Sequence, residues 1–228
     1  MGFRRETYKE EDHMTLILKD EPKEEREYSI LEAGTHLAIC VSIVDFGPQK
    51  VEYLGETKEQ PKVRLAFEVP AERIEYEKDG EKMEGPMMIG KTYTASLYEK
   101  ANLCQHLESW RGRKFTEAEK AGFDLTSVLN KPCMLTVVHR EYKDKTYANI
   151  AGISKVMKGM SVPDAETPLI SFDFDDHTPE QLAELPEWMR EKIADGKALL
   201  AEQRARTEPP PHKHIPPDLD IAGDDIPF

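Results

Sequence analysis

Several short stretches of the chain alternate apolar and polar residues, the pattern of β-strands that bury one face. In the first stretch, Leu37, Ile39, Val41 and Ile43 are the apolar positions. The charged residues 71–90, with Gly and Pro among them, are expected to form a long hairpin loop. The five predicted strands are residues 37–43, 62–69, 91–97, 133–139 and 145–153.

A helical period replaces this alternation between the third and fourth predicted strands. Leu103, Leu107 and Trp110 lie at i, i+4 and i+7, and Gly112 follows where a helix commonly ends. Residues 116–119 (TEAE) have the spacing of a capping box, which predicts a short second helix. We therefore predict a mainly β protein, a five-stranded OB-fold barrel with a helical insertion between strands 3 and 4. An open α+β sheet gives the same order of elements and stays open as an alternative.

The composition changes again after Gly159. Residues 162–176, which include the run FDFDD, are expected to form an acidic, irregular linker. Thr178, Pro179 and Gln181 then have the pattern of a helix start. Apolar residues further on predict an amphipathic helix or helix pair interrupted at Pro186.

These changes divide the chain into four parts. The first is a charged N-terminal segment, residues 1–33, for which we expect partial disorder. The OB-fold domain follows over residues 34–158, and the acidic linker and helical segment over residues 159–207. Residues 208–228 are a Pro-rich spacer, EPPPHKHIPP, followed by an acidic tail for which we expect disorder.

Charge is distributed unevenly along the 228 residues. The net charge is −13, yet residues 90–158 contain 12 Lys and Arg against 7 Asp and Glu, a net +5. Residues 159–228 contain 6 against 16, a net −10. A basic block followed by an acidic end indicates an electrostatic function that the overall charge conceals.

The sequence argues against membrane and secreted proteins. No apolar run approaches the roughly 20 residues of a membrane helix, and we find no secretory signal. Cys40, Cys104 and Cys133 are an odd number without paired spacing, which favours reduced thiols in a cytoplasm over disulfides or zinc.

Enzymatic motifs are also missing from the sequence. No Gly-rich phosphate loop, GxSxG or HExxH pattern occurs, so we predict no catalytic residues, metal or cofactor. Asp173, Asp175 and Asp176 could hold a divalent ion, as in a metal-dependent nuclease. A solvated acidic run in a polar linker is the favoured interpretation.

The chain ends in an acidic sequence with an aromatic tip. Asp224 and Asp225 precede Ile226, Pro227 and Phe228. Such a tip can place the aromatic ring in an apolar pocket of a partner while a Lys or Arg pairs with the terminal carboxylate. The segment DDIPF, at this position, resembles the C-terminal peptide of bacterial-type single-stranded DNA-binding proteins. The resemblance implies docking onto replication, recombination and repair proteins.

Residues 34–155 look more like the single-stranded DNA-binding proteins encoded by tailed bacteriophages and prophages. The segments SWRGRKF, NKPCMLTVVH and YANI carry this likeness. It implies a location in the cytoplasm of a bacterial host and leaves open whether the chain forms a homo-oligomer.

A protein that binds single strands without sequence preference needs cations for the phosphates and flat rings for the bases. The basic middle of the chain and the second predicted strand supply both. The candidate DNA-binding residues are Lys62, Arg64, Tyr93, Tyr98, Lys100, Trp110, Arg111, Arg113, Lys114, Arg140, Tyr142, Lys143, Lys145 and Tyr147.

Some of these residues have a structural interpretation as well. Trp110 completes a helical apolar stripe, which favours the core, and Tyr93 lies between Thr92 and Thr94 and can point inward. The function we predict is binding of single-stranded DNA in replication or recombination, with recruitment of partner proteins through the tail. The alternative is an OB-fold adaptor that docks on host replication proteins without binding DNA.

Overall fold

The computed structural model describes residues 29–53, 55–78, 80–143 and 145–207. The predicted spacer and tail, Phe228 included, and the chain before residue 29 lie outside the described residues. The elements are β1 (Gly34–Tyr53), β2 (Glu56–Lys78), β3 (Glu81–Thr94), α1 (Asn102–Arg111), α2 (Glu117–Lys120), the 3-10 turn η1 (Leu125–Val128), β4 (Pro132–Tyr142), β5 (Lys145–Ser154), β6 (Ile170–Phe172), α3 (Pro179–Glu184) and α4 (Glu187–Thr207).

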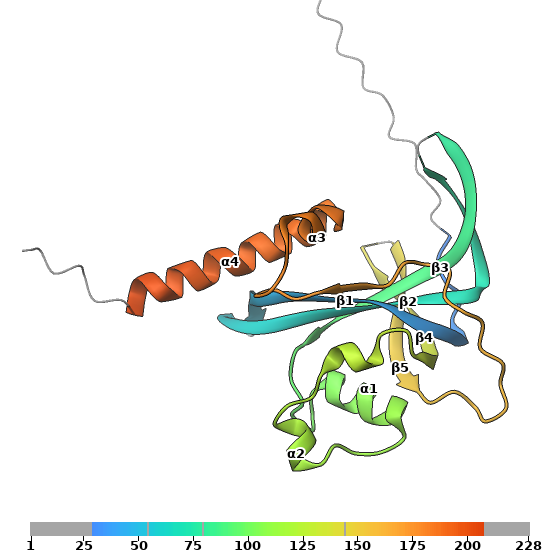
Figure 1. Ribbon diagram of the computed structural model, residues 1–228, viewed down its shortest axis with the longest axis horizontal. Helices are drawn as coiled ribbons and strands as arrows, with labels where there is room; N and C mark the ends of the chain where they lie inside the picture. Colours follow the sequence, from blue (N-terminus) through green and yellow to red (C-terminus); the bar gives the residue numbers. More distant parts are fainter. Residues whose placement is uncertain (1–28, 54, 79, 144, 208–228) are drawn as a thin grey trace, which may run out of the picture.

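Five strands form one strongly curled antiparallel sheet, a half-barrel in the order β3, β2, β1, β4, β5 (Figure 1). Helices α1 and α2 occupy the chain between β3 and β4. The mainly β architecture and the position of the helical insertion are therefore confirmed. A further strand, β6, which the sequence pattern does not predict, pairs in parallel with β1.

Three strands are longer than the alternation pattern predicts. β1 continues through the expected break at residues 45–48 to Tyr53, because a register shift between Asp45 and Gly47 absorbs the irregularity. β2 likewise passes Pro70, with a register shift between Val69 and Arg73, and pairs with β3 to its end. The loop predicted at residues 71–90 is wrong, since most of these residues form a long two-stranded ribbon (Figure 1).

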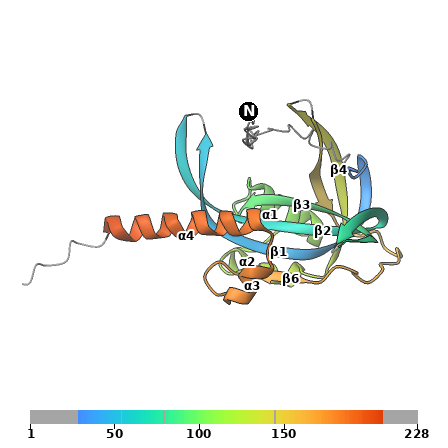
Figure 2. The same ribbon diagram turned by 90° about the horizontal axis from the view of Figure 1, so that it is seen from above.

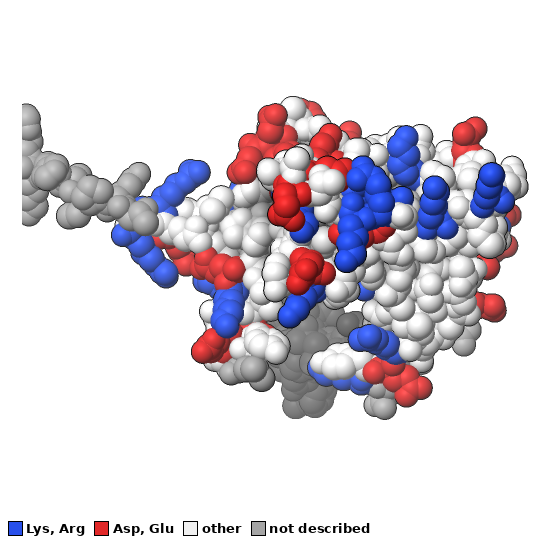
Figure 3. Space-filling model, turned by 90° about the horizontal axis from the view of Figure 1, so that it is seen from below, with Lys and Arg blue, Asp and Glu red and all other residues white. Residues whose placement is uncertain are grey.

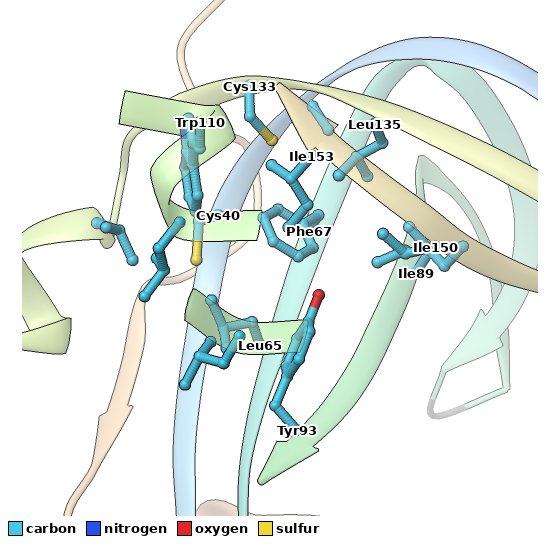
Figure 4. Close-up of a cluster of buried hydrophobic side chains, with 14 of the residues drawn as sticks. Cys40, Leu65, Phe67, Ile89, Tyr93, Trp110, Cys133, Leu135, Ile150 and Ile153 are labelled. Atoms are coloured by element: carbon cyan, nitrogen blue, oxygen red, sulfur yellow. The ribbon is translucent and has the colours of Figure 1, made fainter. Parts of the chain in front are cut away.

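The main core lies inside the curl of the sheet (Figure 4). In β1, Cys40 enters this core, and not Ile39 as the alternation predicts. In β2 the alternate residues Leu65 and Phe67 are buried there, as the period-two pattern predicts. Leu103 and Leu107 of α1 pack against them from the helical insertion. The apolar stripe of the predicted helix thus covers one end of the half-barrel.

The predicted helix boundaries in the insertion are confirmed. Gly112 ends α1 in a left-handed conformation with φ 70°. Thr116 and Glu119 form the complete capping box that begins α2. The end of α1 and the start of α2 can therefore be predicted from local sequence signals alone.

A second, smaller core holds the C-terminal helices on the outer face of β1. Phe172 and Phe174 are buried there against Val44 and Phe46, together with Leu185 and Ile193 from the helical segment. The irregular linker predicted over residues 162–176 is thus wrong for its last part. The aromatic residues of FDFDD anchor that part to the sheet.

The helix pair with a break at Pro186 is confirmed as α3 and α4, and α4 lies against β1 at very short range. A Cβ atom at Gly196 would lie 2.6 Å from the carbonyl oxygen of Phe46 and 2.9 Å from the ring of Phe174. Across the same contact, Gln49 Nε2 donates a hydrogen bond to the carbonyl oxygen of Lys192 at 2.7 Å. The close packing of α4 therefore depends on glycine at position 196.

Glu68 fixes the chain between β5 and β6. This residue lies on the outer face of β2 but is fully buried. Its carboxylate accepts hydrogen bonds from the backbone N–H groups of Glu166 at 3.0 Å and Thr167 at 2.7 Å. Glu68, a polar position in the alternating pattern of β2, thus holds the segment between β5 and β6 against the sheet.

The cysteines Cys40, Cys104 and Cys133 are all buried and unpaired. Burial raises the pKa of the Cys40 thiol to about 12, so this thiol stays protonated at neutral pH. In the part of the chain that the structure describes, none of the helices has both the length and the apolar character needed to cross a membrane.

Candidate nucleic-acid interface

The hairpin of β4 and β5 carries the predicted residues that are most exposed. Arg140 pairs across the strands with Tyr147, and Tyr142 pairs with Lys145. These four side chains alternate with core-side positions such as Ala148, so they share the outward face of the hairpin. Tyr142 is 63% exposed and Tyr147 is 46% exposed. Two rings are therefore accessible beside two cations.

Lys143 adds a third cation at the tip of this hairpin. It has a left-handed backbone with φ 48°, and its Nζ lies 5.1 Å from the centre of the Tyr142 ring. Among the described residues, no carboxylate forms an ion pair with Arg140, Lys143 or Lys145. Within the described residues, the positive charge of the hairpin is thus not neutralised by an ion pair.

Lys91 of β3, at the other edge of the sheet, pairs in register with Leu65 and therefore lies on the core side of the sheet and not on the outward face of the hairpin. Its Nζ donates a hydrogen bond to the carbonyl oxygen of Ile150 at 2.6 Å and so connects β3 to β5. The pKa of Lys91 is lowered, first by burial and second by the positive charge of Arg140. Lys91 lies outside the predicted set, although it is a polar position in the predicted third strand.

β2 presents Lys62 and Arg64 on its outer face. Lys62 Nζ donates hydrogen bonds of 2.8 Å to Gln60 Oε1 and Thr94 Oγ1. The guanidinium group of Arg64 lies over the ring of Trp188 from α4. Burial lowers the pKa of both side chains. Neither forms an ion pair with a carboxylate of the described residues.

Tyr93 and Trp110 lie in the core, which corrects their prediction as stacking platforms (Figure 4). Tyr93 is 3% exposed, and its hydroxyl group is hydrogen-bonded to His106 Nδ1 at 2.9 Å. Trp110 is 6% exposed and donates from Nε1 to the carbonyl oxygen of Pro132 at 2.8 Å. Each occupies a core-facing position of its strand or helix, and this burial leaves no free ring face for a base.

Arg111 and Arg113, also predicted to contact DNA, share one carboxylate. Arg113 donates to both oxygens of Glu119, from Nη1 to Oε2 at 2.9 Å and from Nη2 to Oε1 at 2.6 Å. Arg111 forms an ion pair with the same Glu119 and lies over the rings of Phe115 and Phe123. Both guanidinium groups thus hold the helical insertion together, and we remove them from the candidate interface.

Three remaining predicted residues flank α1. Tyr98 is 61% exposed, and Lys100 and Lys114 are exposed before and after the helix. Figure 3 shows the side of the molecule on which α1 and α2 lie in Figure 1. In its right half, several Lys and Arg side chains stand over a largely uncharged area with Asp and Glu side chains along its rim, whereas both signs mix in its left half. The basic character predicted for the middle of the chain therefore extends to this face.

Among the described residues, three exposed aromatic side chains lie outside the predicted set, and one of them is Tyr76 of β2, 43% exposed. Tyr53, 63% exposed, ends β1, and Trp188, 45% exposed, lies at the start of α4. Figure 2 shows that the β1–β2 and β4–β5 hairpins project to the same side of the sheet, at opposite ends of β3. Tyr53 was missed because the first strand was expected to stop at residues 45–48.

The acidic run considered as a metal site forms a local turn. Asp173 Oδ1 accepts hydrogen bonds from the backbone N–H groups of Asp175 at 2.8 Å and Asp176 at 3.0 Å. Within the described ranges, no group of three or more His, Cys, Asp or Glu side chains is arranged to hold a metal ion. The hydrogen bonds of Asp173 give this run a structural role.

Comparison with protein-family models gives no match for this sequence, and comparison with curated proteins gives none either. The described residues form an antiparallel half-barrel, and its outer side carries exposed aromatic rings and cations, such as Arg64 and Arg140, that form no ion pair with a described carboxylate.

Proposed function

We propose that this protein binds single-stranded DNA without strong sequence preference, in replication or recombination. One observation carries the proposal. The cations of β2, β3 and the β4–β5 hairpin have no carboxylate partner among the described residues, although the chain has a net charge of −13. In so acidic a protein, a face that keeps its positive charge fits an anionic ligand.

The neighbouring rings favour a single-stranded ligand over a duplex. Tyr142 and Tyr147 are exposed on the same hairpin face as Arg140 and Lys145. Unpaired bases expose their flat faces, and each stacked base contributes about 1–3 kcal/mol to binding. Phosphates bound by the adjacent cations would add an electrostatic contribution to the affinity, and this contribution decreases as the salt concentration rises.

The half-barrel is an OB-type barrel. The strand order, the helices between β3 and β4, and the hydrogen bond from Lys91 on β3 to Ile150 on β5 support this assignment. In OB-folds, the face of strands two and three and the loop between strands four and five bind oligonucleotides. The unpaired cations lie on the corresponding elements.

The acidic tail recruits partner proteins of the replication and recombination machinery. The support is the sequence itself, in which Asp224, Asp225 and Phe228 form an acidic, aromatic C-terminal tip. The protein acts without catalysis in the cytoplasm of a bacterial host, as the likeness to phage and prophage proteins implies.

Fluorescence anisotropy of labelled oligothymidylate tests the function directly. We expect binding that weakens steeply between about 50 and 200 mM salt and that exceeds binding to duplex DNA of the same length. Oligouridylate measured beside it tests the preference for DNA over RNA. No binding at low salt, also after removal of residues 218–228, would overturn the proposal and favour the adaptor that binds proteins alone.

A further inference from the structure

The C-terminal helix carries an exposed aromatic residue over the outer face of the sheet. Trp188 begins α4 beside the second core, yet it is 45% exposed. Its ring meets the ring of Phe46 edge to face, with centroids 6.0 Å apart and an angle of 69°. The indole ring is thus supported by the core on one side, while nearly half of the residue stays accessible.

Arg64 lies against the same indole ring. The central carbon of its guanidinium group is 5.1 Å from the ring centre, which is within range of a cation–π contact. Gly90 of β3 makes this position possible, because a Cβ atom there would collide with Nη2 of Arg64. The guanidinium group therefore lies between the start of α4 and the backbone of β3.

The hydrogen-bonding capacity of Arg64 is not satisfied at this position. Its Nε is buried without a hydrogen-bond partner, and no described carboxylate pairs with the side chain. Arg64 pairs in register with Val44 and Thr92, so it lies on the outward side of the sheet. A partly buried guanidinium group without an anion favours binding of a phosphate, which it recognises well.

The contacts of α4 with β1 hold Trp188 in place. Gln49 donates a hydrogen bond to the carbonyl oxygen of Lys192, and Gly196 packs against the backbone of Phe46 and Pro48. Ile193 is buried in the second core between these two contacts. Trp188 is therefore positioned by the fold, as a stacking platform must be.

We propose that Trp188 and Arg64 form one subsite for single-stranded DNA, in which a base stacks on the indole ring and a neighbouring phosphate binds the guanidinium group. The inference rests on the proposed function and assigns α4 to the binding surface. It extends the interface from the β4–β5 hairpin across β3 and β2 to the C-terminal helix.

The two tryptophans of the chain allow a direct test on the full-length protein. In W110F, Trp188 is the single tryptophan left, and we expect oligothymidylate to quench its fluorescence in parallel with the anisotropy of labelled oligothymidylate. In W188F, the remaining buried Trp110 should show little change. This measurement keeps Trp188 itself intact and so does not depend on how well a Trp188 variant folds.

Affinity measurements separate stacking from charge. We expect W188A to weaken binding about tenfold without changing its salt dependence, and W188F to recover most of the affinity. R64Q should lower the slope of log K against log salt by about 0.7, the value for one phosphate contact on a single strand. A loss caused by misplacement of α4 alone would not produce this difference in salt dependence.

The possible outcomes distinguish the subsite from the function. If wild-type protein binds oligothymidylate but Trp188 is not quenched and R64Q keeps the wild-type slope, the subsite is overturned and the proposed function stands. If wild-type protein shows no anisotropy change at low salt, with or without residues 218–228, the proposed function falls and the subsite with it.

Discussion

Arg113 and Arg140 are both exposed arginines in the basic part of the chain, and they differ in their neighbours. Arg113 makes a two-point contact with the carboxylate of Glu119. Arg140 has no ion pair with any described carboxylate and faces Tyr147 across the hairpin. A phosphate would have to displace Glu119 from Arg113, whereas it could bind Arg140 without such a cost.

We therefore expect R140Q to weaken binding of oligothymidylate and to lower the slope of log K against log salt by about 0.7. R113Q serves as the matched control, and its affinity and slope should stay close to those of the wild type. Anisotropy titrations at several salt concentrations check both variants. Equal losses in the two variants would contradict the assignment of the interface to the β4–β5 hairpin.

Glu119 makes the stability of the helical insertion depend on pH. Its pKa lies well below the ordinary value of 4.5, first because of Arg113, then because of the Thr116 backbone N–H and Arg111. A carboxylate whose pKa is lower in the folded state contributes stability above pH 4.5, and this contribution is lost as the pH falls further.

We expect E119Q to unfold at a lower temperature than the wild type at pH 7, with a difference that narrows as the pH falls from 4.5 to 3. Thermal unfolding followed by circular dichroism over this range measures it. A difference in Tm that is the same at pH 3 and pH 7 would show that the ionised carboxylate is not responsible.

At the scale of elements, the docking of α4 depends on a backbone contact. By helix propensity alone, replacing Gly196 with Ala would stabilise the protein by about 1 kcal/mol. The added Cβ atom, however, would lie 2.6 Å from the carbonyl oxygen of Phe46. Overpacking of this kind costs about 1–3 kcal/mol. This cost exceeds the gain in helix propensity, so the substitution should destabilise the protein.

We accordingly expect G196A to lower the free energy of unfolding by about 1–2 kcal/mol and to increase proteolytic cleavage within α4. Urea unfolding and limited proteolysis provide the measurements. G122A is the control, because a Cβ atom at Gly122 would meet no atom within 4 Å. Stabilisation of G196A would mean that α4 packs less closely against β1 than described here.

Elements defined by local signals could be predicted from the sequence. The stripe of α1, the caps at Thr116 and Thr178 and the β4–β5 hairpin depend on residues close together in the chain. The ribbon of β2 and β3 could not be predicted, because a register shift between Val69 and Arg73 lets β2 continue past Pro70 into the charged residues that follow. In this ribbon, pairing with the neighbouring strand prevails over local breaking signals.

For the candidate site, the sequence predicts which types of residue are present but not which of them are accessible to a ligand. The sequence indicates where cations and rings are enriched, but their availability depends on contacts between distant residues. Glu119 neutralises two of the predicted arginines, and burial removes Tyr93 and Trp110. The placement of Trp188 over Arg64 depends on Phe172 and Phe174, which fix the C-terminal segment to β1 from within an acidic run.

At the scale of the whole molecule, the acidic end and the basic middle are expected to attract each other. Residues 159–228 carry a net charge of −10, whereas residues 90–158 carry +5. The last eleven residues alone contain Asp218, Asp220, Asp224 and Asp225. Joined to the domain by a Pro-rich spacer, they would stand near the cations at an effective concentration of about millimolar order. The tail would then compete with DNA, and bound DNA would release it for partner proteins.

This competition predicts that deletion of residues 218–228 raises the affinity for oligothymidylate at low salt, by about tenfold, and has little effect at high salt, where charge attraction is screened. A variant with the four aspartates of this segment changed to asparagine keeps the length and the Phe228 tip, and it should reproduce the gain if charge is responsible. Anisotropy titrations of the three proteins at two salt concentrations measure the effect. An unchanged affinity in both variants would mean that the tail does not occupy the cationic face, and its release by DNA would then have no basis.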